Sequence, residues 1–270
     1  MSFTQVPGTD RNGRIGHADL DRYIAGAQTA KLSDASRLEE GKREVKVIGL
    51  RRVIAQKVAL SKRTIPHFSY IEEVDLTELE SLRLFLNAQR EEKQVKLTYL
   101  PFLMLALSRL LKDFPQCNGH FDDDAGVVTQ YDAVHIGIAT QTSMGLKVPV
   151  VKHAEALGLW ELAEEVIRIS EGARNSTSGA DELTGSTITI TSLGALGGLA
   201  STPVINHPEV AIIGVNKSML RPVIKQDQVV SRLMMNLSSS FDHRVVDGYD
   251  AAQLIQSYKG MLEHPAAMFI

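Results

Sequence analysis

Cysteine is almost absent from this sequence, with Cys117 the single one among 270 residues. One thiol cannot form a disulfide within the chain, and without neighbouring ligands it makes a poor metal site. We therefore expect a reducing compartment and no bound metal. Cys117 itself is expected to be a packed core side chain rather than a nucleophile.

Long apolar runs are also lacking. The longest one, at residues 99–111, is interrupted by Ser108 and Arg109 and is too short to cross a bilayer. Residues 1–4 show neither the apolar stretch of a signal peptide nor the arginine-rich pattern of a transit peptide. No association with a membrane is expected.

An excess of charge of one sign is missing as well. The formal net charge is -3, and basic and acidic residues are interspersed, so a broad surface for nucleic acid or anionic lipid is not expected. The sequence also lacks a Walker loop, a Gly-x-Ser-x-Gly elbow and the spacing of zinc ligands. The glycine-rich stretch at residues 194–198 has neither the spacing nor the following helix of a dinucleotide-binding loop.

The composition is otherwise that of a globular protein, with 44% hydrophobic and 23% charged residues. That material is enough for one large domain with a small appendage. Residues 1–25 combine a turn-rich piece with a short helix at residues 17–25, and residues 26–45 are small and charged, which predicts a linker. We expect a domain boundary near Lys46 and one domain over residues 46–270.

Helical and strand patterns alternate along the large domain. Helices are expected at residues 48–62, 75–93, 101–114, 157–173 and 247–262, and strands at residues 68–74, 134–139, 147–151, 187–191, 210–215 and 233–240. Asp75 with Glu78 three residues later predicts a capping box for the second of these helices. Some strands are too close in sequence for a helical crossover, which predicts antiparallel pairs in a mixed α/β fold.

One histidine is placed as chemistry would require. His243 lies between Asp242 and Asp247, where a predicted strand ends and a helix begins that Asp247 can cap. A position held by two regular elements suits a general base. On the residue pattern alone, a structural hydrogen-bonding histidine is the more frequent case, so both interpretations stay open at this point.

A family resemblance favours the chemical interpretation. Phe-Asp-His-Arg-Val-Val-Asp-Gly at residues 241–248 resembles the Asp-His-Arg-x-x-Asp-Gly signature of the acyltransferases of 2-oxo acid dehydrogenase complexes. It resembles more loosely the His-x-x-x-Asp-Gly motif of chloramphenicol acetyltransferase. Further landmarks of the first family follow in order, among them Ile-Pro-His-Phe at 65–68, Gly-Leu-Lys-Val-Pro-Val at 145–150, Thr-Ser-Leu-Gly at 191–194 and Pro-Glu-Val-Ala-Ile at 208–212. The resemblance covers the chain from about residue 46 onward and implies a chloramphenicol acetyltransferase-like α/β fold, a mixed sheet with flanking helices.

The N-terminal residues resemble part of another module of that family. Gly-Thr-Asp-Arg-Asn-Gly-Arg-Ile at residues 8–15 is similar to the second half of the peripheral subunit-binding domain and departs from it at Asp10. The preceding helix of that module and a lipoyl domain are missing from the sequence. The resemblance therefore implies a trimmed chain, with the lipoyl group carried on a domain that this chain lacks.

The resemblance also implies an activity, the transfer of acyl groups between a dihydrolipoyl arm and coenzyme A. His243 would act as the general base, and a thiol that titrates near about 8.5 is a suitable proton donor to a neutral imidazole. Thr191 would donate a hydrogen bond to the tetrahedral oxyanion. Ser192 is the adjacent alternative, and only one of the two can point into a site because neighbouring strand residues face opposite sides.

Charged residues are assigned by the same resemblance. Asp247 would form a site-ordering ion pair with Arg51 or Arg52, and Arg83 would bind the phosphates of coenzyme A together with Arg52. A surface charge is the alternative for each of these arginines.

Oligomerisation belongs to this family pattern. The resemblance implies a homotrimer whose active site lies between subunits, trimers that assemble into a larger cage, and association with the 2-oxo acid decarboxylase and dihydrolipoamide dehydrogenase components. The apolar residues 266–270 are expected to form an inter-trimer contact. A branched-chain complex is favoured, with an acetyl-transferring pyruvate complex or a catalytically silent scaffold as alternatives. The expected compartment is the bacterial cytoplasm, or the mitochondrial matrix in a eukaryote.

Overall fold

The computed structural model describes residues 6–32 and 41–270 and divides the chain into two units, Met1–Lys46 and Val47–Ile270. In the first unit, helix α1 spans His17–Leu32. The buried Asp19 accepts hydrogen bonds from the Gly16 amide at 3.0 Å and from Thr9 Oγ1 at 2.6 Å, and so ties the turn-rich piece to the helix. The helix runs past Ala25, where the sequence predicted a linker, and residues 33–40 of that predicted linker lie outside the described residues.

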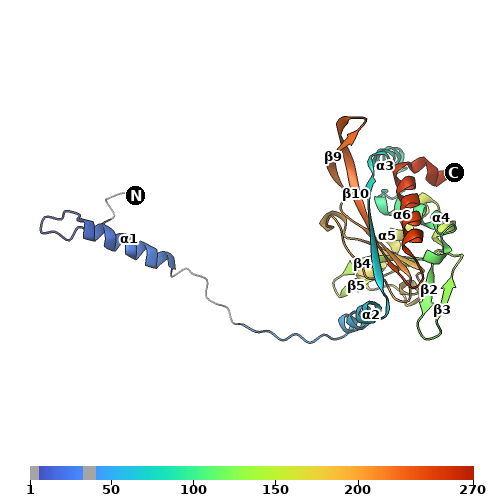
Figure 1. The fold of residues 1–270 in the computed structure, drawn as a ribbon, viewed down its shortest axis with the longest axis horizontal. Helices are drawn as coiled ribbons and strands as arrows, with labels where there is room; N and C mark the ends of the chain where they lie inside the picture. Colours follow the sequence, from blue (N-terminus) through green and yellow to red (C-terminus); the bar gives the residue numbers. More distant parts are fainter. Residues whose placement is uncertain (1–5, 33–40) are drawn as a thin grey trace. The chain divides into compact units, whose positions relative to one another are not determined.

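The second unit is built on an eight-stranded sheet, with strand order β1-β10-β8-β7-β4-β5, β6 beside β4 and β9 beside β10 (Figure 1). The strands are β1 His67–Asp75, β4 Ile136–Thr142, β5 Gly145–Lys147, β6 Val150–Val151, β7 Ile188–Ser192, β8 Ala211–Val215, β9 Met219–Lys225 and β10 Gln228–Asp242. The β4–β7 and β7–β8 pairs are parallel and the other pairs of this sheet are antiparallel. The predicted mixed α/β fold is confirmed.

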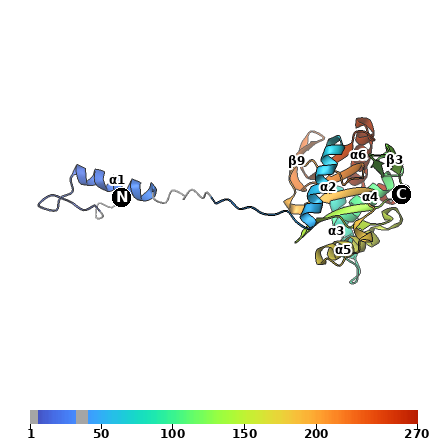
Figure 2. The ribbon, with the colours of Figure 1, turned by 90° about the horizontal axis from the view of Figure 1, so that it is seen from below.

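Helices flank this sheet on both faces. They are α2 Leu50–Thr64, α3 Thr77–Gln89, α4 Tyr99–Leu110, α5 Leu159–Asn175 and α6 Gly248–Glu263. Side chains of α3 to α6 pack against one face and form the main core, to which almost all of α4 contributes. Helix α2 crosses the other face, as the view from below shows (Figure 2).

The alternation of residue types in β7 explains the two faces. Ile188 and Ile190 belong to the main core, whereas Thr189 and Thr191 point to the side of α2. On β4, Ile138 faces the core and Ala139 faces α2, and β8 divides in the same way. On the α2 face, β4 and β7 therefore present small or polar side chains, and β8 presents Ile212.

Several local expectations were wrong. The start of α3 is not a capping box, because Leu76 is the N-cap and Asp75 instead accepts hydrogen bonds from the amide and hydroxyl of Thr77 at 3.0 and 2.5 Å. The sequence patterns also missed a hairpin of β2 Gly119–Asp122 and β3 Val127–Gln130. Its polar turn, in which Asp122 accepts from two following amides, hid the strand alternation. Strand β9 was missed too, and with the start of β10 it projects from the body as a long hairpin (Figure 1).

The C-terminus requires a correction as well. Residues 266–270 were expected to be free for contact with another chain, but Met268 is fully buried in the core of its own chain. The short helix Pro265–Phe269 folds it inward. Phe269 and Ile270 are 50% and 97% exposed, so these are the large side chains of the segment that are available to a neighbour.

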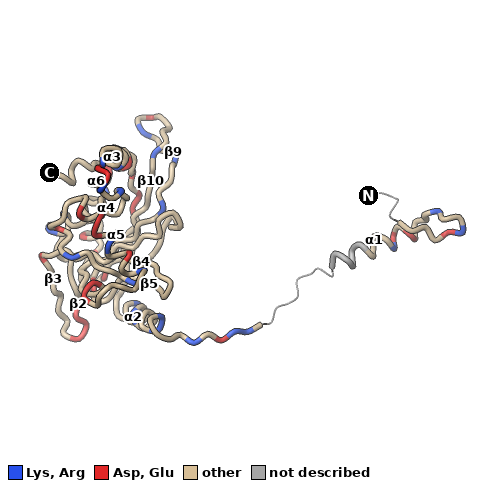
Figure 3. Tube along the Cα trace, turned by 180° about the vertical axis from the view of Figure 1, so that it is seen from behind, with Lys and Arg blue, Asp and Glu red and all other residues tan. Residues whose placement is uncertain are grey.

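The distribution of charge, the apolar helices and the single cysteine bear on the remaining expectations from the sequence. Figure 3 shows basic and acidic positions interspersed along the second unit. Within the described residues, no helix is long and apolar enough to cross a membrane, and no group of three potential ligands could hold a metal ion. Cys117 is buried, and burial raises the pKa of its thiol, which fits the predicted packed side chain.

Candidate active site

The turn that carries His243 is fixed by its two neighbours. Strand β10 ends at Asp242, which is fully buried. Its carboxylate accepts hydrogen bonds from the Arg244 amide at 3.0 Å and from Arg244 Nε and Nη2 at 2.9 and 2.6 Å. This bidentate pair closes the turn, so His243 is held at its apex by charge-assisted bonds.

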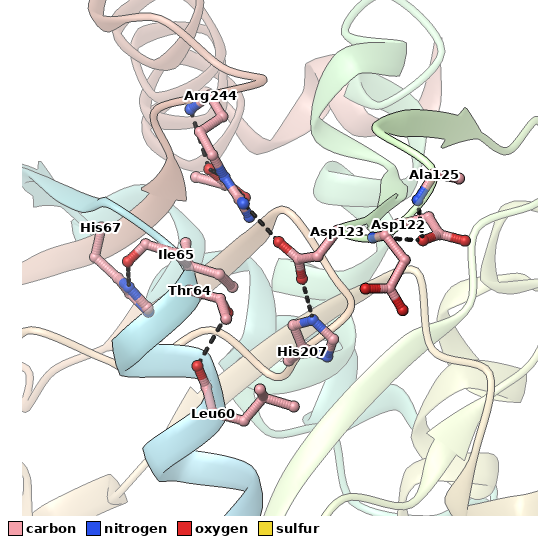
Figure 4. Close-up of polar contacts among 11 residues, drawn as sticks. Leu60, Thr64, Ile65, His67, Asp122, Asp123, Ala125, His207 and Arg244 are labelled. Atoms are coloured by element: carbon pink, nitrogen blue, oxygen red, sulfur yellow. Dashed lines mark hydrogen bonds and ion pairs between the residues drawn. The ribbon is translucent and has the colours of Figure 1, made fainter.

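A second carboxylate holds the same arginine from the other side (Figure 4). Asp123 accepts from Arg244 Nη1 at 2.5 Å and contacts His207 Nε2 at 2.8 Å. Hydrogen bonds with His207 and Arg244 lower the pKa of Asp123, and the bond to Asp242 raises the pKa of Arg244. The guanidinium also lies 4.2 Å from the centre of the Phe121 ring. Arg244 therefore acts as a brace for the turn.

The side chain of His243 itself is exposed. Its ring packs on Phe68 with 4.3 Å between centroids, and its amide donates to the Pro66 carbonyl at 3.2 Å. No hydrogen bond to the imidazole occurs among the described residues, so both ring nitrogens are open to a substrate. The predicted helix cap is confirmed, because Asp247 accepts from the amides of Tyr249 and Asp250 at 2.9 and 3.0 Å.

Thr191 lines a large cavity on the face of the sheet that α2 covers. The cavity has a volume of about 500 Å³ and lies between α2 and strands β4, β7 and β8. Its walls are mostly apolar, from Leu50, Val53, Ile54, Val58, Leu146, Val148, Pro203, Ile205 and Ile212 among others. The Thr191 hydroxyl has no hydrogen-bond partner in the described part of the chain, so it is free to donate. Ser192 lines a different and smaller hollow of about 250 Å³, beside Tyr99.

One chain does not bring His243 and Thr191 together. Thr191 pairs with Gly214, and Gly214 pairs with Ser238 on β10. Ser238 precedes His243 by five residues, so the two side chains are separated by about 17 Å along the strands and about 10 Å across them, or roughly 20 Å in all. A single tetrahedral intermediate cannot contact both residues of the same chain.

The arginines assigned from the resemblance lie elsewhere. Arg51 and Arg52 are exposed in the first turn of α2, and within the described residues neither forms an ion pair with Asp247. Arg83 donates to Glu80 from Nε and Nη2 at 2.7 and 2.8 Å and to the Leu97 carbonyl at 3.1 Å. These bonds to Glu80 raise the pKa of Arg83. The guanidinium therefore ties α3 to the start of α4.

Sequence reasoning missed one buried carboxyl near the cavity. Glu209 is 1% exposed, and burial raises its pKa to about 7. Its Oε1 accepts hydrogen bonds from Ser186, Thr189 and Asn206. The available signal was a lone glutamate directly before the apolar residues 210–213, a context in which burial is expected.

The raised pKa of Glu209 predicts a pH dependence of stability. The folded chain holds the proton more tightly than an unfolded chain with the ordinary value of 4.5. The contribution of Glu209 to the free energy of unfolding should therefore be largest below pH 4.5 and fall by about 3 kcal/mol as the pH rises to about 7 and beyond. Glu209→Gln cannot ionise and should remove this part of the slope, as measured by denaturant unfolding between pH 4.5 and 8. Glu164→Gln, at an exposed position, serves as the control, and equal slopes in all three proteins would contradict the assignment.

The chain is similar to known acyltransferases. The family model of the 2-oxoacid dehydrogenases acyltransferase (catalytic domain) matches residues 39–270. The lipoamide acyltransferase component of the branched-chain alpha-keto acid dehydrogenase complex of Pseudomonas aeruginosa is 54% identical over 98% of this chain. The chain spans 63% of the length of that relative.

Solved structures agree with the fold. A dihydrolipoamide acetyltransferase of Azotobacter vinelandii matches with a TM-score of 0.82 and 37% identity, over 85% of this chain and 95% of the other. The cubic core of a pyruvate dehydrogenase multienzyme complex matches with the same TM-score and identity, over 86% and 96% of the two chains. Chloramphenicol acetyltransferase, at 14% identity and a TM-score of 0.51 over 82% of this chain and all of the other, shares the fold. The predicted chloramphenicol acetyltransferase-like architecture is thereby confirmed.

The Azotobacter study concerns the role of a serine, a histidine and an asparagine in the catalytic mechanism. In that protein the serine lies 52 residues before the histidine, and the asparagine lies four residues after it. Thr191 and Asp247 stand at the same two separations from His243. The three positions singled out by sequence therefore have the same spacing as the serine, the histidine and the asparagine of that enzyme.

Proposed function

The chain belongs to the acyltransferase (catalytic domain) family of the 2-oxoacid dehydrogenases, and from this premise we propose that it transfers acyl groups between dihydrolipoyl groups and coenzyme A. The observation that carries the proposal is the braced turn at residues 242–244, which presents an exposed imidazole that has no hydrogen-bond partner among the described residues. The spacing shared with the Azotobacter acetyltransferase supports the same roles for His243 and Thr191.

The proposed reaction is an exchange between a thiol and a thioester. His243 takes the proton of the attacking thiol, and the thiolate adds to the thioester carbonyl. The carbonyl oxygen becomes an oxyanion that accepts a hydrogen bond from Thr191. When the intermediate collapses, the C–S bond of the original thioester breaks, and the departing thiolate receives the proton from His243. Every atom is accounted for, and no metal or redox partner is required.

This reaction needs two copies of the chain. Because the two groups of one chain are roughly 20 Å apart by strand geometry, we propose that His243 of one subunit acts with Thr191 of another. Helix α2 supports this arrangement, since it borders the Thr191 cavity and leaves Val53 and Val58 58% and 44% exposed. A neighbouring subunit would cover these side chains and complete the cavity wall. We propose a homotrimer, a closed ring in which each subunit shares His243 with one neighbour and Thr191 with the other.

The acyl group is proposed to be branched. Support comes from the 54% identity to a branched-chain component, against 37% to the acetyl-transferring structure. The mostly apolar cavity beside Thr191 suits a hydrocarbon chain.

An assay with different thioesters tests this proposal. Transfer from isobutyryl-coenzyme A to free dihydrolipoamide should exceed transfer from acetyl-coenzyme A in kcat/KM by about tenfold or more, because each buried methyl adds to the binding energy of the transition state. Isovaleryl-coenzyme A, which is also branched and one carbon longer, is the third substrate, and it shows how much chain length the site accepts. A preference for acetyl would assign the chain to an acetyl-transferring complex, and transfer of none of the three would remove the proposed activity.

Further parts of the proposal concern binding and assembly. Coenzyme A phosphates are proposed to contact Arg52, which is exposed, and Arg83, which would have to exchange its bonds to Glu80. The lipoyl arm would arrive on a separate domain. The match to a cubic core supports assembly of trimers into a larger particle, to which the exposed Phe269 and Ile270 would contribute. The decarboxylase and dihydrolipoamide dehydrogenase components remain the proposed partners, in the cytoplasm of a bacterium.

A further inference from the structure

The buried carboxyl of Glu209 has no part in the proton transfers described above, yet it joins separate walls of the Thr191 cavity. Its Oε1 accepts hydrogen bonds from Ser186 Oγ at 2.5 Å, Thr189 Oγ1 at 2.9 Å and Asn206 Nδ2 at 2.6 Å. Thr189 and Asn206 both line the cavity. Asn206 also donates to Ser186 at 3.3 Å, which closes the group into a small network.

This network reaches the position of Thr191 through the strand. Thr189 and Thr191 are two residues apart on β7, so their side chains point to the same face. A hydrogen bond that fixes the Thr189 side chain therefore also fixes the position of the β7 backbone, and with it Thr191, relative to the cavity. The opposing wall includes Pro203, Ile205 and Asn206, and the bond from Asn206 holds this wall against the same carboxyl. One oxygen thus sets the separation of the two walls.

We propose that Glu209 is a positioning residue that holds the Thr191 hydroxyl and the opposing segment 203–206 at the separation required by the tetrahedral intermediate. The proposal rests on the proposed function, because it assumes the oxyanion role of Thr191. It adds a group outside the signature motif whose effect on the reaction passes through another residue.

The second oxygen indicates which form of the carboxyl performs this task. Glu209 Oε2 is buried and has no hydrogen-bond partner within the described residues. The charge of Lys57, which lies on α2 at the cavity wall, lowers the pKa of Glu209, but burial raises this pKa by more. His120 lies across an isolated bridge from Glu209, and His207 is engaged with Asp123. A neutral side chain with one acceptor oxygen is therefore sufficient, and glutamine supplies it.

A double-mutant cycle on turnover tests the proposal with the full chain as an oligomer. Glu209→Ala removes the acceptor and should lower kcat for acyl transfer by about tenfold or more, with little change in the KM for coenzyme A. In a Thr191→Val background the same change should lower kcat by less than about twofold, because residues that act as a unit are not additive. Glu209→Gln keeps the acceptor and should stay within about threefold of the wild type.

Matched threonine variants separate positioning from general stability. Thr189→Val removes the donor from β7 to Glu209 and should reproduce the loss of turnover. If Glu209→Ala fails to form an oligomer, Thr189→Val takes its place in the test. Thr187→Val makes the same change at a buried threonine whose hydroxyl bonds to the backbone of His135 instead, and it should leave kcat unchanged. Additive losses in the cycle, an unaffected Glu209→Ala, or a glutamine variant as impaired as alanine would overturn the proposal while leaving the proposed function standing. A Thr191→Val protein with normal turnover would instead remove the oxyanion role, and the positioning role with it.

Discussion

Replacement of His243 by alanine is expected to lower kcat by roughly 10²–10⁴-fold, the usual contribution of a general base. The imidazole is the group that accepts the thiol proton in the proposed exchange, and no other basic side chain is proposed for that step. Folding should be little affected, because the ring is exposed and the described structure gives it no hydrogen bond. Its backbone bond to Pro66 does not depend on the side chain.

Turnover and particle size should be measured together for this variant. Steady-state transfer to free dihydrolipoamide reports on the base, and sedimentation reports on the oligomer. His264→Ala, which removes another exposed histidine at the end of α6, should leave turnover unchanged. Retention of more than a tenth of the wild-type kcat by His243→Ala in an intact oligomer would end the general-base assignment.

The second large effect is expected at Thr191. Valine has nearly the same shape as threonine but lacks the hydroxyl, so Thr191→Val should lower kcat by about 10²–10³-fold, as for the loss of one oxyanion donor. The KM for coenzyme A should change little, because the hydrogen bond forms mainly in the transition state.

Ser192 supplies the matched control for this change. It neighbours Thr191 but lines a different hollow, so Ser192→Ala should keep near wild-type turnover. A rise in KM at unchanged kcat for Thr191→Val would move the residue from the oxyanion to substrate binding. A large loss in Ser192→Ala, with Thr191→Val unaffected, would assign the donor to the neighbouring strand position.

Local patterns in the sequence were enough for much of the fold and part of the site. The alternation of isoleucine and threonine in residues 187–191 predicts a strand with one apolar face, and the structure places Ile188 and Ile190 in the core. The aspartate before α6 predicts a cap, which Asp247 forms. Such features depend on residues that are close in sequence, so a single sequence displays them.

Other features depend on residues that are far apart in the chain. Asp123 and Arg244 are 121 positions apart in the chain, and no local pattern in either segment predicts that they form an ion pair. The apolar residues 266–270 do not by themselves show whether Met268 packs on its own chain or on another. The path of the short helix Pro265–Phe269 shows that Met268 turns inward. Glu209 was missed because a glutamate is usually exposed, and its burial depends on two donors, Ser186 and Thr189, that lie about 20 residues away in the chain.

Co-expression of two inactive variants shows whether two subunits together complete one active site. His243→Ala and Thr191→Val chains with different tags would be assembled together, and mixed oligomers would be purified through both tags. If His243 of one subunit works with Thr191 of the next subunit of a trimer, every mixed trimer has one site in three that combines two intact residues, and about a third of the wild-type kcat should return. Mixed oligomers that remain as inactive as either variant alone would contradict a shared site.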